Sequence, residues 1–212
     1  GNANDESGNG YNGIVNGASL SLDRFGSANS SYEFLGETQS GTNNQVILVD
    51  NVIDIPDYDP TFVDQLTISF WANIYTSNNG DFLQRRTDNN IDYACGPSSC
   101  HLGNVGNVGT PNLSLFNTWN HYLYIYDGIN ISVYVDGVLN ASVSGSGNLS
   151  NNTNIMNFGK YIYHGGLTHY FFYNGKLDDI GIWDRAVTLQ EIQELYNGSS
   201  GSLSDILWST GD

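Results

Sequence analysis

Apolar and polar residues alternate along much of this chain, and the alternation predicts strands. Residues 66–74 (LTISFWANI) place an apolar side chain at every second position, which indicates a strand with one buried face. The stretch 119–145 reads as three strands, because two Asp-Gly pairs interrupt it and Asp-Gly favours a tight hairpin turn. Further short strands are predicted on either side of a turn at 88–90, and within 154–162 and 175–184.

One helix is predicted near the C-terminus. Thr188 and Glu191 have the spacing of a capping box, and Gly198 marks the end of the helix. Four apolar residues at helical spacing form its predicted stripe: Leu189, Ile192, Leu195 and Tyr196. Many short strands and one late helix predict an all-β fold, a two-sheet antiparallel β-sandwich (jelly roll) with one short C-terminal helix.

The sandwich is expected to occupy residues 1–198. The stretch after Gly198 is rich in Gly and Ser, as a linker is, and the letters ILWSTGD that follow look like a new strand. Residues 199–212 are therefore expected to be a linker and the start of a following module of a longer protein.

Composition limits the partners of the domain. The chain has 212 residues, of which 25 are glycine and only 13% are charged, as in turn-rich β proteins. Its net charge of −16, from 22 acidic and 6 basic residues, argues against a nucleic-acid partner, since phosphate binding needs a basic surface. It contains no run of 18 apolar residues, so membrane insertion is not expected. The acidity either keeps the domain soluble or serves bound calcium.

The two cysteines lie close together in CGPSSC. Four residues between Cys95 and Cys100 permit a small closed loop, and a protein exported to an oxidising environment would form that disulfide. A zinc site that begins with the two cysteines and His101 is the weaker alternative, because no fourth ligand lies nearby in sequence.

Five stretches in order resemble one known family. They are residues 1–36, NVIDIPD at 51–57, LTISFWANI, the hairpin region 119–142, and NGKLDDIGIWDRAVTLQEIQELYNG at 174–198. Together they resemble the laminin-G-like jelly-roll domains of the concanavalin A-like superfamily. The resemblance implies one convex and one concave sheet. In bacteria it also implies a carbohydrate-binding module, attached to a polysaccharide-degrading enzyme or an adhesive surface protein.

The superfamily that the chain resembles includes glycoside hydrolases and polysaccharide lyases, so a catalytic function has to be considered. The hydrolases of the superfamily carry Glu-x-Asp-x-x-Glu on one strand, and none of the five glutamates of this chain stands in that pattern. We therefore expect non-catalytic binding of a polysaccharide, such as an algal or plant cell-wall glycan, by a secreted or cell-surface protein in which this domain is a tethered monomer. The alternatives are an adhesive module with a protein partner and, third, a diverged hydrolase or lyase.

Related folds implied by the resemblance hold a structural calcium between their first and last strands. The oxygen-bearing candidates here are Asp5 and Asn9 in the first turn, and Asp178 and Asp179 near the end. The alternative is that Asp5 caps its own turn and that one of the two later carboxylates pairs with Arg24 or Arg185.

Residues 161–175 (YIYHGGLTHYFFYNG) place rings and histidines together, which suits a sugar site on the rim of the sandwich. The alternative is that the rings pack against neighbouring loops. Arg85 and Arg86 should point to opposite faces of a strand, so at most one faces the concave side, where it would bind the carboxylates or sulfates of an acidic polysaccharide. The other reading pairs it with Asp88 or Asp92. The candidate carbohydrate-binding residues are Arg85, Arg86, Tyr93, His101, His121, Tyr161, Tyr163, His164, His169 and Tyr170.

Overall fold

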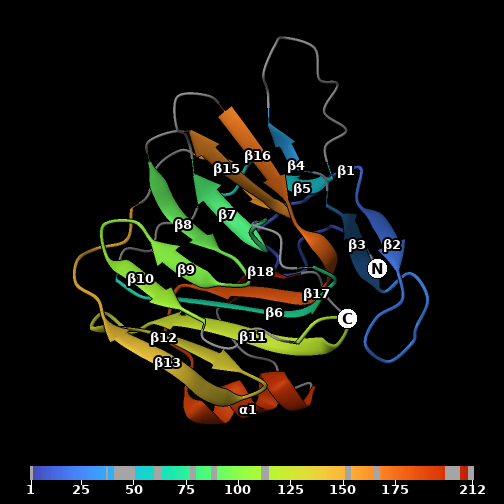
Figure 1. Cartoon of the computed structure of the whole chain (residues 1–212). Helices are drawn as coiled ribbons and strands as arrows, with labels where there is room; N and C mark the ends of the chain where they lie inside the picture. The colour runs from blue at the N-terminus through green and yellow to red at the C-terminus, as the bar shows by residue number, and fades with distance from the viewer. Residues whose placement is uncertain are drawn as a thin grey trace.

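Two large antiparallel sheets form the body of the molecule in a computed structural model of the chain (Figure 1). The structure describes residues 2–36, 38–40, 51–59, 64–76, 80–86, 90–110, 115–150, 154–164, 168–198 and 206–209. The seven-stranded sheet A has the order β1 (Ile14–Asn16), β5 (Val52–Ile55), β14 (Met156–Phe158), β7 (Leu83–Arg86), β8 (Ile91–Cys95), β9 (Ser99–Leu102) and β10 (Gly106–Gly109).

Sheet B packs against sheet A. Its order is β13 (Val138–Ser144), β12 (Asn130–Val135), β11 (Trp119–Tyr126), β6 (Leu66–Ile74), β17 (Asn174–Trp183), β3 (Ser31–Leu35) and β2 (Ser19–Ser21), and β18 (Ile206–Ser209) pairs with β17. The prediction of an all-β sandwich with one short helix is thus confirmed. Strand β18 lies in the stretch expected to belong to a following module, yet it pairs with β17 at Gly181–Trp183, so sheet B extends past residue 198.

The alternation in β6 sets the inner face of sheet B. Leu66, Phe70 and Ile74 of this strand are among the side chains that fill the space between the sheets. On the neighbouring β11 the inner face carries Tyr122, Tyr124 and Tyr126. The sequence left open which face of β11 is core, and the register answers it, because Tyr122 stands opposite Phe70.

The other face of β11 is also covered. Leu123 and Ile125 belong to a second apolar cluster with Trp183, Val187 and Ile192. Ile192 comes from helix α1 (Leu189–Asn197), which lies against the outer face of sheet B, below β11 and β12 in Figure 1. The helix begins with the predicted capping box and ends at the predicted glycine, whose left-handed backbone suits a residue without a side chain.

Leu189, one of the four residues of the predicted apolar stripe, does not face the sheet. Leu189 is 69% exposed, whereas Ile192 is buried and Leu195 packs at the margin of the second cluster. Val187, which precedes the cap, occupies the place against the sheet instead. In the part of the chain that the structure describes, no helix has the length and apolar character that a membrane crossing requires.

A third sheet, C, stands at one end of the sandwich, at the top of Figure 1. It consists of β15 (Lys160–His164), β16 (Thr168–Phe172) and β4 (Thr38–Ser40), which continue strands of the two large sheets beyond short bends. Gly36 and Gly159 form two of these bends with positive φ, and a Cβ at Gly159 would meet the Phe34 ring at 2.4 Å. The ring-rich stretch is therefore a hairpin at the rim, and its end, Phe172 and Tyr173, is buried.

We expect Phe70→Ala to destabilise the domain by about 3–5 kcal/mol, because a fully buried ring in contact with Phe82, Tyr122 and Tyr124 would leave a cavity. Phe25→Ala, at a position 75% exposed, is the matched control and should change the free energy of unfolding by less than about 1 kcal/mol. Urea unfolding measures both, and equal effects would contradict the assignment of the core.

Candidate functional site

A row of mainly polar side chains crosses the outer face of sheet A. The strand register places these residues side by side from β5 to β10, one from each of six strands: Asp54, Asn157, Gln84, Ala94, His101 and Asn107. In the middle, the Gln84 amide donates to the Asn157 side-chain oxygen at 2.9 Å, and both residues are buried. Towards the two ends, Asp54 and His101 are half-buried and Asn107 is exposed. The middle of the row is therefore buried with its amides paired, and the two ends of the row are accessible.

Arg86 and Tyr161 lie beside this row. The Arg86 guanidinium carbon is 5.0 Å from the centre of the Tyr161 ring, a cation–π arrangement that ties β7 to sheet C. Tyr161 also packs against the Phe171 ring of β16, at 5.9 Å between centres. Both Arg86 and Tyr161 are half-buried, so each keeps part of its surface for solvent or a ligand.

His101 is the titratable side chain of the row on β9. Burial lowers the pKa of His101, and the positive charge of Arg86 lowers it further. The imidazole is therefore neutral near pH 7, with one ring nitrogen as donor and the other as acceptor. A neutral imidazole of this kind suits the hydroxyl groups of a sugar.

Three of the predicted contact residues are buried and do not face a ligand. Arg85 is inside the sandwich, where Nη1 lies 3.4 Å from Asp92 and Nε donates to the Asn154 carbonyl at 3.2 Å. The prediction that the two arginines point apart holds, and Arg86 is the outer one. Tyr93 is also fully buried, because the inner face of β8 contributes to the core.

His121 is the third buried residue. It lies on the helix-covered face of sheet B, where its Nε2 is 2.8 Å from the Ser69 hydroxyl and its ring packs against Trp71. Burial lowers the pKa of His121 to about 3, with a smaller contribution from Arg24. A side chain 1% exposed makes no contact with a polysaccharide.

Four more candidates stand on the β15–β16 hairpin. Tyr163 pairs with His169 and His164 with Thr168, while Tyr170 pairs with both Ile162 and Gln39. Their backbones therefore belong to sheet C, and their side chains lie outside the described part of the structure. Their role as sugar contacts stays a prediction.

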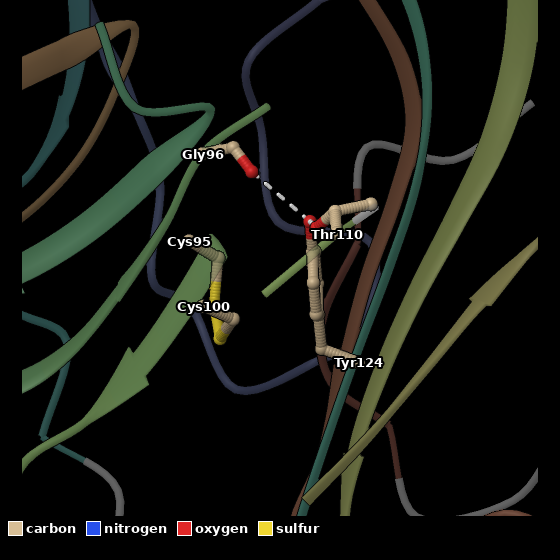
Figure 2. Close-up of a disulfide and its surroundings, with 5 residues drawn as sticks. All are labelled: Cys95, Gly96, Cys100, Thr110 and Tyr124. Carbon is tan, nitrogen blue, oxygen red and sulfur yellow. Dashed lines mark hydrogen bonds between the residues drawn. A yellow bond between two sulfur atoms is a disulfide. The ribbon is translucent and has the colours of Figure 1, made fainter. Parts of the chain in front are cut away.

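The disulfide joins two neighbouring strands of sheet A (Figure 2). Cys95 of β8 stands directly opposite Cys100 of β9, and their sulfur atoms are bonded. The Tyr124 hydroxyl of β11 reaches across from sheet B and donates to the Gly96 carbonyl at 3.0 Å. The turn between the cysteines is thereby attached to both sheets.

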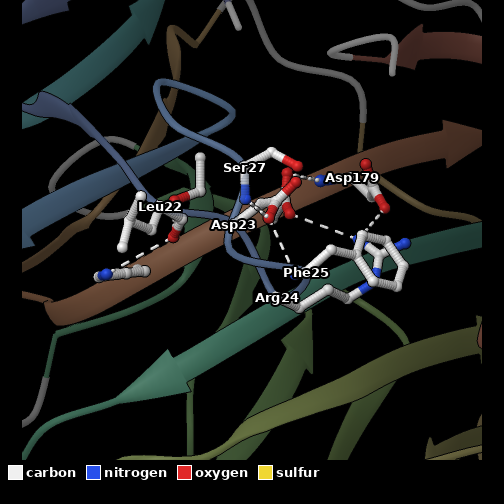
Figure 3. Close-up of polar contacts among 9 residues, drawn as sticks. Leu22, Asp23, Arg24, Phe25, Ser27 and Asp179 are labelled. Carbon is white, nitrogen blue, oxygen red and sulfur yellow. Dashed lines mark hydrogen bonds and ion pairs between the residues drawn. The ribbon is translucent and has the colours of Figure 1, made fainter.

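The carboxylates expected to bind calcium already face a cation. Arg24 forms a close ion pair with Asp179 (Figure 3). It also lies within 3.3 Å of Asp178, and its guanidinium is 4.7 Å from the Trp71 ring centre. Burial, and then the neighbouring Asp179, raises the pKa of Asp178 to about 7, although Arg24 opposes the shift. Calcium would require ionised carboxylates that are free of an arginine.

The first turn is a separate feature. Asp5 accepts hydrogen bonds from the backbone of Ser7 and Tyr11, at 2.9 and 3.0 Å, so it caps its own turn. Asn9 bonds to Ser7 within that turn. No three acidic, histidine or cysteine side chains gather into a metal site within the ranges described above. The alternative of a capped turn and an Arg24 ion pair describes these four residues in the structure, and calcium binding stays a prediction.

Sequence comparison places the chain in a family. It belongs to the concanavalin A-like lectin/glucanases superfamily, since the family model Laminin_G_3 matches residues 40–193. This confirms the resemblance inferred from the sequence. No curated protein matches the chain.

Solved structures share the fold at low identity. Domain 4 of AbnA, a GH43 extracellular arabinanase from Geobacillus stearothermophilus, in complex with arabinotriose, has a TM-score of 0.61 and 16% identity over 92% of this chain and 93% of that one. The binding domain of Paraclostridial Mosquitocidal Protein 1 has the same TM-score and identity, and the match covers 92% of this chain and 49% of that one. A SAP-like pentraxin from Limulus polyphemus reaches a TM-score of 0.54 and 19% identity over 71% of this chain and 78% of that one.

We expect Arg24→Ala to lower the free energy of unfolding by about 3 kcal/mol, because it leaves Asp178 and Asp179 together without their cation. Lys176→Ala removes a cation from β17, the strand that carries Asp178 and Asp179. It is the control and should have a small effect on the free energy of unfolding. Chelation with EDTA should not shift the melting temperature. A drop of several degrees on chelation would restore the calcium prediction.

The raised pKa of Asp178 predicts a pH dependence of stability. Between about pH 4 and pH 7 the folded state keeps a proton that the unfolded chain has released, so this residue makes stability fall as the pH rises through that window. The free energy of unfolding of Asp178→Asn, relative to that of the parent, should therefore be higher at pH 8 than at pH 4. The expected difference is about 2 kcal/mol after screening by solvent. Urea unfolding at both pH values measures the free energies of unfolding of the parent and the variant. If their difference is the same at pH 8 and pH 4, Asp178 does not keep its proton in the folded state over this window.

Proposed function

We propose that this domain is a non-catalytic carbohydrate-binding module that holds a polysaccharide on the outer face of sheet A. The observation that carries the proposal is the polar row with accessible ends, flanked by the Tyr161 ring. Sugars present hydroxyl groups and apolar C–H faces, and they are bound by fixed donors and acceptors beside an aromatic ring. The arabinotriose complex of the AbnA domain, which has this fold, supports the proposal.

The opposite surface of the sandwich is less suited to a ligand. Helix α1 and the Arg24 segment cover the outer face of sheet B at Leu123, Ile125 and Trp71. The outer face of sheet A instead carries the row of mainly polar side chains, with accessible ends. We therefore assign the ligand to sheet A.

The row also argues against hydrolysis at this site. Asp54 is its one carboxylate, and the Asn16 amide donates to that carboxylate at 2.8 Å. Glycosidases of the usual kind need two carboxyl groups on either side of the bond. Binding without cleavage would hold a catalytic domain, or a cell, close to an algal or plant polysaccharide. A secreted, multidomain parent protein accords with the Cys95–Cys100 disulfide, since disulfides persist in oxidising compartments.

Affinity electrophoresis through gels that contain plant and algal polysaccharides tests the proposal. The domain should be retarded by at least one of them, and His101→Ala and Asn107→Ala should each weaken that binding about two- to tenfold, as the loss of one hydrogen bond does. Gln190→Ala on helix α1 is the matched control and should bind like the parent.

Other outcomes would overturn the proposal in distinguishable ways. Retardation by none of the gels, together with binding to a protein surface, would identify an adhesive module. New reducing ends or unsaturated products in the presence of the domain would identify an enzyme. Retardation that the two substitutions leave unchanged would place the sugar on another surface.

A further inference from the structure

Arg86 differs from the other arginines of the chain. Each of those faces a carboxylate: Arg24 faces Asp178 and Asp179, Arg85 faces Asp92, and Arg185 binds Glu191 through two hydrogen bonds of 2.7 and 3.0 Å. Within the described ranges Arg86 forms no ion pair, and its Nε is buried without a hydrogen-bond partner. In a chain with 22 acidic residues, an arginine that meets no carboxylate among the described residues calls for an explanation.

The guanidinium is held in place all the same. Its guanidinium carbon lies 5.0 Å from the centre of the Tyr161 ring, a cation–π contact. Such a contact uses none of the N–H donors as a hydrogen bond, so the two terminal nitrogens of the guanidinium can serve an acceptor. Two parallel N–H groups match the oxygens of a carboxylate or a sulfate, and such charge-assisted bonds are about twice as strong as neutral ones.

The neighbouring titratable groups leave this positive charge uncompensated. His101 is neutral near pH 7 for the reasons given above. Burial raises the pKa of Asp81 well above its usual range, and Arg86 only partly opposes the shift. Asp81 also forms no ion pair with Arg86 among the residues described, and its Oδ2 is buried without a hydrogen-bond partner. Among the residues described, no ionised carboxylate pairs with Arg86, so its charge can serve a ligand.

We infer that the polysaccharide bears acidic groups, carboxylate or sulfate, and that Arg86 binds one of them at the edge of the polar row. This inference rests on the proposed function and adds the chemical class of the ligand. Tyr161 is a positioning residue, because it orients the guanidinium. Neutral polysaccharides lack the group that Arg86 would pair with, so the site selects against them.

Two pairs of polymers with matched backbones test the inference. Polygalacturonate and its methyl ester differ in the carboxylate, and dextran sulfate and dextran differ in the sulfate. Isothermal titration or affinity electrophoresis should show binding to the acidic member of at least one pair at about ten times or more the affinity for its neutral counterpart. The pair that responds identifies which anion is recognised.

Substitutions then assign the selectivity to Arg86. Arg86→Gln should remove the preference for the acidic member, a loss of about tenfold to a hundredfold in its affinity. Arg86→Lys keeps the charge but not the planar pair of donors, so its affinity should lie between those of the parent and Arg86→Gln. It also carries the test if Arg86→Gln fails to fold. Lys176→Gln changes the net charge equally on sheet B and should bind like the parent.

Two results would overturn the inference and leave the proposed function intact. One is equal binding to both members of each pair. The other is a preference for the acidic member that Arg86→Gln retains, or that Lys176→Gln loses to the same extent. Retardation by no polysaccharide at all would instead remove the proposed function, and the inference with it.

Discussion

Strand β11 must be buried on both faces, and this constraint decides which surfaces of the molecule are open. Its tyrosine face fills the space between the sheets, where Tyr122 stands opposite Phe70. Its other face carries Leu123 and Ile125, which would be exposed without a second layer. Helix α1 supplies that layer, and its capping box and left-handed terminal glycine mark where the helix begins and ends. Sheet B is therefore the structural side of the domain, and sheet A keeps a polar outer face.

The strands, turns and helix ends were predicted well because each depends on residues that are close together in the sequence. Alternation in residues 66–74, the Asp-Gly turns and the capping box each depend on neighbours a few residues apart. The disulfide follows the same rule, since Cys95 and Cys100 are five positions apart and a short hairpin brings them together. The family resemblance added that one sheet is convex and the other concave, which no local pattern contains.

The candidate site was only partly predictable because strand register assembles it. Gln84, Asn157 and Asn107 were missed, since one amide in a strand looks like any surface residue until its neighbours are known. The signal available in the sequence was a polar residue inside each of the short strands 83–86, 106–109 and 156–158, which could have indicated a shared polar face. Arg85 and Arg86 were correctly expected to diverge, but only the structure shows which one lies inside.

Net charge and local charge act in opposite directions on an acidic ligand. A domain at −16 repels a polyanion over the distance of the Debye length, whereas Arg86 attracts it only on contact. Salt weakens the long-range repulsion more than it weakens a partly buried contact, so binding of an acidic glycan need not fall as salt is added. Salt dependence alone therefore does not report the role of Arg86 in this protein. The repulsion would also suppress adhesion of unrelated polyanions, so the proposed site would favour ligands that place an acidic group against the Arg86–Tyr161 pair.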